Sequence, residues 1–460
     1  MRRLVLLASV AGLAACAGPR PPAPTAATQA PPAQWREAAL TPASVDPRWW
    51  TAFGDPALAA VVEQALSNNP DLGLAAARVE EARAQFDLAQ GMRGPNLVIA
   101  GGGADQRALN AFGQPVEQHA GQAQFSAAYD LDLFGRLKAS SAAARSSLLA
   151  TQAAQDSVRL AIASSAASGY VTLLALDARL EVLQKTVAAR EGALKLIRRR
   201  VEAGYGAQLE LKQASAEYQS ALQLIPAVEL ARRRQEDGLR LLLGENPGTI
   251  ARGAGLYSLA VPWISPGQPA ALLRRRPDIW QAEQQLAASD HGLDAARAAF
   301  MPNVQLNGSW GYVASDLIDD PVHVFSIGGS ILAPIFDSGR LKAQQGQAAA
   351  RRDQAAFAYR KTVLNAFREV EDGLASVQRS GEQEIAATAQ RDALAQALTL
   401  AESRYRAGYS PYLEQLDAQR GLLAADLNLV QLHADRLTAA IGLYQALGGG
   451  WTGADKLASR

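Results

Sequence analysis

The residues Leu133-Phe134-Gly135-Arg136-Leu137-Lys138 return about 205 residues later as Asp337-Ser338-Gly339-Arg340-Leu341-Lys342. Other short sequence motifs recur in the same order and at nearly the same spacing. They are Asn69-Pro70-Asp71 with Arg276-Pro277-Asp278, Gly94-Pro95-Asn96-Leu97 with Met301-Pro302-Asn303-Val304, Ala203-Gly204-Tyr205 with Ala407-Gly408-Tyr409, and Leu242-Leu243-Gly244 with Ala446-Leu447-Gly448. Chance matching would not preserve both order and spacing, so the chain is predicted to be one unit duplicated. We expect the first repeat over 41–255, the second over 256–450 and a C-terminal tail over 451–460.

Apolar residues alternate with other residues just before both copies of the first motif, 133–138 and 337–342, and this alternation predicts β-strands. The apolar faces are Phe125, Ala127, Tyr129, Leu131 and Leu133, then Val304, Leu306, Gly308, Trp310 and Tyr312, then Phe325, Ile327, Ile331 and Ile335. A weaker, glycine-rich strand is expected over 96–105. Each repeat would supply one hairpin, at about 96–134 and 303–337, with loops near 106–118 and 314–321.

These strands have the length and the terminal aromatic residues that are typical of membrane-spanning β-strands. A soluble antiparallel sheet with one wet face would show the same alternation. Four strands cannot close, and an open edge in hydrocarbon leaves backbone groups without hydrogen bonds. If the strands enter a membrane, several chains must therefore share one barrel. Two chains would give about eight strands and a filled interior, whereas three would give about twelve strands and a water-filled lumen in a three-fold ring.

Long helices are predicted where no proline interrupts the pattern, at 136–203 and 340–407. Apolar residues recur in the first at coiled-coil spacing, at Leu173, Leu180, Val187, Leu194 and Val201, with Leu176, Leu183 and Ile197 on a second seam. Each segment would be about 100 Å long at ~1.5 Å per residue. Helices of about half that length are expected at 56–92, 208–243, 268–300 and 411–447.

Two short helices placed end to end would match one long helix in length, which favours a wall of uniform height. Ala and Ser dominate 139–168 and 343–358, so large apolar side chains are too sparse to fill a solid core of that length. The pattern therefore indicates a hollow helical cylinder. A solid coiled-coil scaffold is the alternative.

The N-terminus predicts export and a lipid anchor. Arg2 and Arg3 precede an apolar run that ends in Leu13-Ala14-Ala15-Cys16, which resembles the lipobox of bacterial lipoproteins. Cys16 is the only cysteine, so a covalent lipid is the economical use of its thiol, although a plain signal peptide with an incidental cysteine is possible. We expect a signal peptide at 1–15 and, over 16–40, a lipidated N-terminus with a proline-rich, extended tether. No other stretch reaches ~18 uninterrupted apolar residues, so no transmembrane helix is expected.

Each long helix ends at Ala-Gly-Tyr, where Gly204 and Gly408 are predicted to cap it in the left-handed conformation. Beyond the second turn, Glu414 and Asp417 are three residues apart and so share a helical face. If that face points inward in a trimer, six carboxylates would ring the narrow end. Solvated residues on an outer face are an equally good interpretation.

Nothing in the sequence predicts an enzyme, a cofactor site or a nucleic-acid interface. His119, His291, His323 and His433 are scattered without metal-ligand spacing and are expected to be solvent-exposed. No nucleophile elbow, phosphate-binding loop or dinucleotide turn occurs. The net charge of +1 gives no reason to expect nucleic acid as a partner.

Several sequence motifs together resemble those of one known family. They are Trp49-Trp50, Phe53-Gly54-Asp55-Pro56, Asn69-Pro70-Asp71-Leu72, Leu131-Asp132-Leu133-Phe134-Gly135, Arg275-Arg276-Pro277-Asp278, Pro334-Ile335-Phe336-Asp337 and Ala366-Phe367-Arg368-Glu369-Val370. Over about 40–450 the chain is similar to the outer membrane factors, the efflux lipoproteins of the TolC, OprM and NodT type. The resemblance implies a homotrimer with a twelve-stranded outer-membrane β-barrel, continuous with a twelve-helix periplasmic α-barrel and a collar that includes the 244–268 linker.

The resemblance also implies where the channel closes. Acidic residues just after the second glycine turn form the family's periplasmic aperture, which corresponds to Glu414 and Asp417. Ser410 stands where a well-known member has a bridging arginine, with Glu210 at the position of its acidic partner, so packing of Tyr405, Tyr412 and Leu413 is expected to hold the closed state instead. The turns at Gly204 and Gly408, with Glu210, are the expected docking landmarks for a periplasmic adaptor.

The function implied by these features is passive conduction across the outer membrane. A periplasmic adaptor and an inner-membrane transporter, of the RND type or another, would supply the energy and choose the substrate. The protein would be a lipid-anchored cell outer membrane lipoprotein with palmitate on Cys16 and no other cofactor. The alternative is a periplasmic structural lipoprotein whose coiled-coil helices brace the cell envelope.

Overall fold

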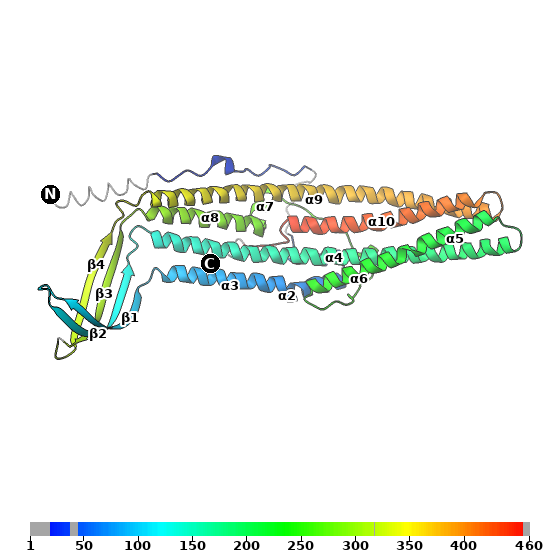
Figure 1. The fold of residues 1–460 in the computed structure, drawn as a ribbon. Helices are drawn as coiled ribbons and strands as arrows, with labels where there is room; N and C mark the ends of the chain where they lie inside the picture. Colours follow the sequence, from blue (N-terminus) through cyan, green and yellow to red (C-terminus); the bar gives the residue numbers. More distant parts are fainter. Residues whose placement is uncertain (1–18, 37–44, 317, 454–460) are drawn as a thin grey trace. The chain divides into compact units, whose positions relative to one another are not determined.

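The computed structural model describes residues 19–36, 45–316 and 318–453. They are mostly helical, with one small antiparallel sheet (Figure 1). The chain divides into two compact units: Met1–Gln29, Ala77–Gln152 and Gln281–Lys361 form the first, and Ala30–Ala76, Ala153–Trp280 and Thr362–Arg460 the second. The predicted signal peptide at 1–15 and the predicted lipid attachment site Cys16 lie outside the described residues.

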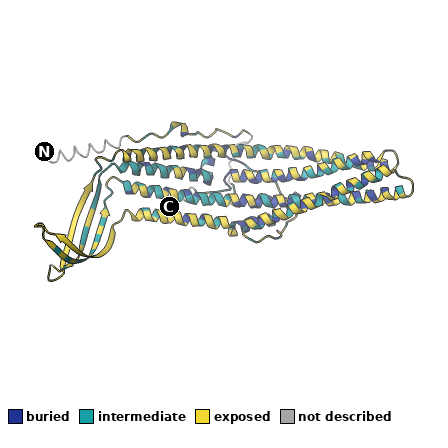
Figure 2. Ribbon diagram, viewed as in Figure 1, coloured by how far each residue is buried: buried dark blue, intermediate teal, exposed yellow. Residues whose placement is uncertain are grey.

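The sheet lies in the first unit and has the strand order β1-β2-β3-β4, with every neighbouring pair antiparallel. The strands are β1 (Asn96–Leu109), β2 (Pro115–Asp130), β3 (Asn303–Ser315) and β4 (Val322–Leu332). On one face Trp310 pairs with both Phe125 and Phe325, and the Phe125 and Trp310 rings stack at 6.1 Å. Every residue of β1 and β4 is exposed (Figure 2), so neither edge of the sheet is covered by the described part of the chain.

The strands are displaced from their predicted limits. The predicted 106–118 loop is mostly strand, because Asn110 turns the chain tightly: its side-chain oxygen accepts hydrogen bonds from the N–H groups of Phe112 and Gln114, both at 3.0 Å. At the other end Leu131, Leu133 and Ile335, which were predicted to continue the strands, lie beyond them. There Asp132 has a left-handed backbone (φ 47°), and Pro334 has no N–H to donate.

The long helices are α4 (Arg136–Glu202) and α9 (Arg340–Arg406), of 67 residues each. Each follows a left-handed glycine, Gly135 with φ 75° and Gly339 with φ 82°. An aspartate caps each first turn. The Asp132 carboxylate accepts hydrogen bonds from the Leu137 and Lys138 N–H groups at 2.9 and 2.7 Å, and that of Asp337 accepts one from Leu341 at 2.7 Å. The motif that recurs at 133–138 and 337–342 therefore forms a strand-to-helix turn.

Three of the four shorter helices are divided, contrary to the prediction. The segment 56–92 contains α2 (Pro56–Asn68) and α3 (Pro70–Gly91), 208–243 contains α5 (Gln208–Leu222) and α6 (Leu224–Leu242), and 268–300 contains α7 (Pro269–Arg275) and α8 (Pro277–Ala298). Proline explains the breaks, because it lacks an N–H and disfavours helical geometry in the residue before it. Pro70 and Pro277 begin new helices, and Pro226 lies in the first turn of α6. The fourth helix, α10 (Tyr412–Ala446), contains no proline and is continuous.

A buried polar side chain fastens two of these breaks within the second unit. Asn69 donates from Nδ2 to the carbonyl of Leu242 at 2.9 Å, and Arg276 donates from Nη1 to the carbonyl of Ala446 at 2.9 Å. Both acceptors are the last residue of a helix, whose carbonyl has no partner in its own helix. Arg276 also forms an ion pair with Glu369 at 2.7 Å, which joins the Arg-Pro-Asp motif to the Phe-Arg-Glu-Val motif.

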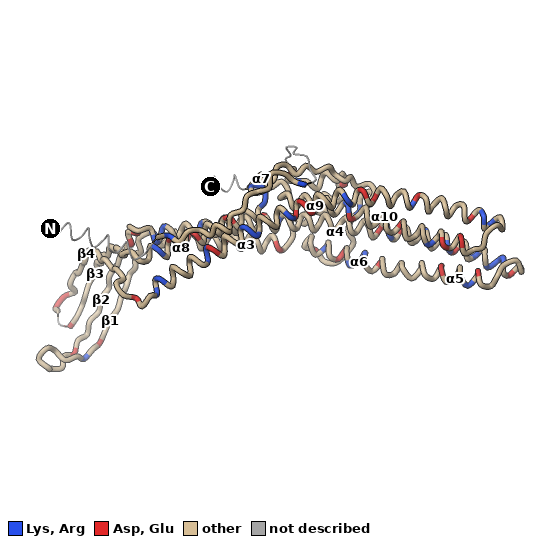
Figure 3. Tube along the Cα trace, turned by 90° about the horizontal axis from the view of Figure 1, so that it is seen from above, with Lys and Arg blue, Asp and Glu red and all other residues tan. Residues whose placement is uncertain are grey.

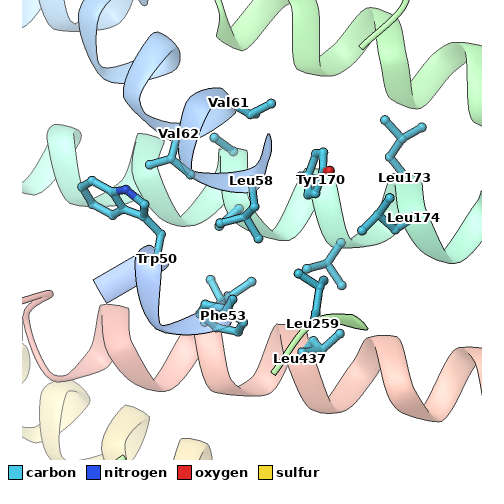
Figure 4. Packing of buried hydrophobic residues seen from close by; sticks show 14 of the residues in the cluster. Trp50, Phe53, Leu58, Val61, Val62, Tyr170, Leu173, Leu174, Leu259 and Leu437 are labelled. Carbon is cyan, nitrogen blue, oxygen red and sulfur yellow. The ribbon is translucent and has the colours of Figure 1, made fainter. Parts of the chain in front are cut away.

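The main hydrophobic core of the second unit gathers α2, α4, α10 and the short helix η3 (Trp49–Phe53) (Figure 4). Trp49 stacks on Tyr444 at 5.2 Å, and Phe53, Leu58 and Tyr170 are fully buried. The predicted seam of α4 is buried at Leu173, Leu180, Leu183, Leu194 and Ile197.

The core also anchors the 244–268 linker, which contains the short helix η4 (Leu256–Ser258). The Tyr170 hydroxyl donates to Asp55 Oδ2 at 3.1 Å and accepts a hydrogen bond from the Gly253 N–H at 2.8 Å. Burial raises the pKa of Tyr170 to about 12, and the nearby Asp55 carboxylate adds to the shift. Asp55 also caps α2 by accepting from the Ala57 N–H at 2.8 Å.

The described part of the proline-rich tether, residues 19–36, is packed in both units, whereas the sequence predicted an extended segment that is not packed. In the first unit, which includes η2 (Thr25–Ala27), the buried Arg352 donates to the carbonyls of Pro21 and Pro22 at 3.1 and 2.9 Å. In the second, the buried Trp35 donates to the carbonyl of Gly267 at 2.8 Å. An extended proline-rich chain has no internal hydrogen bonds, so its carbonyls are available to these donors.

Among the described residues, one helix is long and apolar enough to cross a membrane by length and composition alone. It is α4, and half of the relevant stretch is buried. Since α4 contributes Ile162, Tyr170 and Leu174 to the main core, its hydropathy is that of a core helix.

Candidate functional site

The predicted aperture lies within the second unit, where α4 turns into α5 and α9 turns into α10. Gly204 (φ 79°) and Gly408 (φ 78°) are left-handed, as predicted. The backbone N–H of Tyr205 donates to the carbonyl of Arg200 at 2.8 Å, and that of Tyr409 donates to the carbonyl of Arg404 at 2.9 Å. These bonds satisfy carbonyls at the helix ends, and a residue with a Cβ would be strained in place of either glycine.

A small hydrophobic cluster supports the two turns. It contains Leu194, Ile197, Ala214, Tyr405, Tyr412 and Leu416, which come from α4, α5, α9 and α10. The rings of Tyr405 and Tyr412 lie 5.4 Å apart, and the Arg200 guanidinium lies 5.3 Å from the centre of the Tyr405 ring. Both tyrosines are therefore packed within the cluster. Leu413 is 51 % exposed and does not join the cluster.

One hydrogen bond in this cluster joins the two helical hairpins. The Tyr405 hydroxyl on α9 donates to Glu210 Oε2 on α5 at 3.1 Å. Burial raises the pKa of Tyr405, and the Glu210 carboxylate raises it further, so the hydroxyl keeps its proton at neutral pH. Burial likewise raises the pKa of Tyr412 to about 12.

A second connection, which the sequence analysis missed, lies deeper in the same hairpins. Glu217 on α5 pairs with Arg190 on α4 at 3.1 Å and with Arg420 on α10 at 2.5 Å. The Arg190 and Glu217 side chains are nearly buried, whereas that of Arg420 is 56 % exposed. The signal available in the sequence was the seven-residue spacing of Glu210 and Glu217, which places both on one face of α5.

The predicted acidic residues lie on the exposed side of α10. Glu414 is 3.8 Å from Arg404, and Asp417 is 3.9 Å from Arg420. Acidic and basic residues both occur along α5 and α10 (Figure 3). The Ser410 hydroxyl is buried and has no hydrogen-bond partner among the described residues, so Tyr405 rather than position 410 meets Glu210.

Within the described residues, no group of three His, Cys, Asp or Glu side chains could hold a metal ion. His433 was predicted to be exposed, but it is buried, with Nδ1 2.6 Å from Glu384 Oε1. Arg436 binds the other oxygen of Glu384 at 2.8 Å. The prediction was wrong because α9 presents a carboxylate to the histidine at this position.

A family model described as outer membrane efflux protein matches residues 61–245 and 269–449. The chain is 34 % identical over 470 residues to a pyoverdine export outer membrane protein, OpmQ, from Pseudomonas aeruginosa, covering 98 % of this chain and 97 % of that protein. It is 35 % identical over 458 residues to the outer membrane protein OprJ of the same species, covering 94 % and 91 % of the two chains.

Solved structures show the same fold. The outer-membrane channel OprN superposes with a TM-score of 0.87 at 28 % identity and covers 95 % of this chain and 99 % of its own. The structure of CusC, described in terms of folding and transmembrane channel formation, gives a TM-score of 0.83 at 31 % identity and covers 94 % and 99 %.

Proposed function

Since the chain belongs to the outer membrane efflux protein family and is therefore an outer-membrane component of an efflux system, we propose that it works as a homotrimeric exit duct. Three copies would share one twelve-stranded barrel in the outer membrane and one twelve-helix cylinder in the periplasm. Substrates would pass through this duct without chemical change.

The two unpaired sheet edges are the observation that carries this proposal. Within the described chain β1 pairs on one side with β2 and β4 on one side with β3, so the outer edge of each has no strand partner. The two strands contain 14 and 11 residues, long enough to cross a hydrocarbon layer. Backbone groups on a lipid-exposed edge must be hydrogen-bonded. Pairing β4 of one copy with β1 of the next in a closed ring would satisfy both edges.

The helices support a hollow wall. α4 and α9 have 67 residues each, and the remaining helices are shorter segments that can be placed end to end. The duplicated unit then gives each chain two long helices and two composite ones. Three chains would contribute twelve helices to the cylinder.

We place the gate at the glycine turns. The Tyr405–Glu210 hydrogen bond and the Arg420–Glu217 ion pair would hold the two hairpins of each chain together in the closed state. Glu414 and Asp417 would then ring the opening in the trimer with six carboxylates, and the exposed Leu413 would contact a neighbouring copy. A periplasmic adaptor would dock near Gly204, Gly408 and Glu210, and an inner-membrane transporter would supply the energy.

The lipid anchor completes the proposal. Cys16 would carry the lipid after removal of residues 1–15, and the packed tether would connect it to the body of the protein. The scaffold alternative has no support, because the outer membrane efflux protein family model matches most of the chain.

Reconstitution in planar bilayers tests the duct directly. Protein purified in detergent should migrate as a heat-modifiable trimer and should give discrete single-channel conductance. A monomer that stays soluble after removal of the lipid, and that conducts nothing, would overturn the proposal. Deleting β4 (residues 322–332) should abolish both the trimer and the conductance, since it removes one edge of the shared barrel.

A further inference from the structure

A groove of about 390 Å³ lies in the first unit, where β2 passes into α4 and β4 passes into α9. Its apolar lining comes from both repeats and includes Leu133, Phe134, Met301, Pro302, Leu332 and Pro334. Arg136 and Arg340, the arginines of the motif that recurs at 133–138 and 337–342, also line the groove. The groove thus combines an apolar surface with two guanidinium groups.

Large apolar side chains flank this groove and remain exposed. Phe336 is 89 % and Ile335 is 95 % exposed, and Leu133 and Leu332 are also exposed. Aromatic residues gather at the ends of membrane strands, at the boundary between hydrocarbon and headgroups. If the sheet crosses the membrane, the groove would therefore lie at the level of the headgroups.

The charges around the groove are unevenly paired. Asp130 binds Arg136 at 3.2 Å, while Asp132 and Asp337 accept hydrogen bonds from helix N–H groups. Arg340, Lys138 and Lys342 are exposed and form no ion pair within the described residues. Arg340, which lines the groove, thus has no anion, and Lys138 and Lys342 lie two residues beyond Arg136 and Arg340 in the first turns of α4 and α9. The whole chain is nearly neutral, with a net charge of +1.

We propose that this junction binds an anionic glycerophospholipid. Arg340 would contact the phosphate, since a guanidinium donates two parallel hydrogen bonds to such a group. Lys138 and Lys342 would add charge attraction to an anionic headgroup layer. The apolar groove would take the glycerol end of the acyl chains. The inference rests on the proposed function only in requiring that the sheet crosses the membrane.

Native mass spectrometry of the purified, delipidated protein tests the site. The protein would be exposed to detergent micelles that contain either phosphatidylglycerol or phosphatidylcholine. The wild type should retain more phosphatidylglycerol, because its net negative charge matches the unpaired basic groups. Arg340→Gln with Lys342→Gln should weaken that retention roughly 25-fold, at about fivefold per charge.

Two further variants make the outcome specific. Lys361→Gln removes an exposed charge elsewhere on α9 and should leave retention unchanged. Arg340→Lys keeps the charge but loses the paired donors, so it should fall between the wild type and the double variant. Equal retention of the two lipids by the wild type, or full retention by the double variant, would overturn the lipid site.

The failure of the lipid site can be told apart from failure of the duct. The double variant should still form the heat-modifiable trimer and should conduct as the wild type does. Loss of trimer and conductance in the wild type would instead contradict the proposed function.

Discussion

The Tyr405 hydroxyl on α9 donates a 3.1 Å hydrogen bond to Glu210 on α5. Two helical turns further along α5, Glu217 forms an ion pair with Arg420 on α10. Both connections link the α4–α5 hairpin to the α9–α10 hairpin. One is contributed by a buried aromatic residue and the other by a half-exposed arginine. Their different burial means that they contribute differently to stability and to gating.

Replacing Tyr405 with Phe should loosen the closed state while keeping the ring packed against Tyr412. A hydrogen bond to a charged acceptor contributes ~1.5 kcal/mol, so resting openings should become about tenfold more frequent in planar bilayers. Tyr409→Phe is the matched control, because Tyr409 is on the same turn and is 80 % exposed. An unchanged opening frequency in Tyr405→Phe would show that this bond does not hold the gate.

Replacing Glu217 with Gln should cost more stability than replacing Arg420 with Gln. Glu217→Gln leaves the buried Arg190 without its counter-charge, which costs about 3 kcal/mol, whereas Arg420→Gln removes a half-exposed partner that contributes less than about 1 kcal/mol. Urea unfolding followed by circular dichroism would compare the variants. Equal destabilisation, or a larger effect of Arg420→Gln, would contradict this ranking.

Much of the fold could be predicted because its signals are local. The period of two in 303–312, the absence of proline in 136–203 and the glycines at 204 and 408 each dictate backbone geometry directly. The break before Pro226 was missed because a proline is tolerated in the first turn of a helix, so the helical pattern continues after it. The packing of the tether depends on Arg352 and Trp35 meeting residues far away in sequence, which no local pattern reveals.

The candidate site was predicted in part for the same reason. The turns and the shared face of the acidic residues follow from spacing within one element. The resemblance to a family supplied their roles at the aperture, which stay predictions. The Glu217 pairs and the contact between His433 and Glu384 depend on how separate helices face each other. Charge and periodicity alone do not determine that.

Neutralising the acidic pair on α10 should increase the conductance of the resting pore. Glu414→Gln with Asp417→Asn should raise resting conductance severalfold and reduce block by divalent cations, because six carboxylates would be lost from one ring. Planar bilayer recordings with and without Mg²⁺ measure both effects. Glu181→Gln, which changes an exposed acid on α4, should alter neither. Unchanged block in the double variant would place the acids outside the pore.

Replacing Tyr170 with Phe should destabilise the core of the second unit and change its response to alkali. The variant leaves the Gly253 N–H without its acceptor and removes the hydroxyl that donates to Asp55 Oδ2, at a cost of about 1–3 kcal/mol. Burial raises the pKa of Tyr170 to about 12, above the ordinary value of 10. A raised pKa contributes stability that is fully present below pH 10 and is lost as the pH rises toward 12. The wild type should therefore lose more stability over this range than Tyr170→Phe, although Tyr412, whose pKa is also raised to about 12, keeps some loss in both. Unfolding midpoints in urea at several alkaline pH values would measure the difference, with the exposed Tyr205→Phe as the control. If the two proteins lost stability in parallel as the pH rose, Tyr170 would not be the group that titrates.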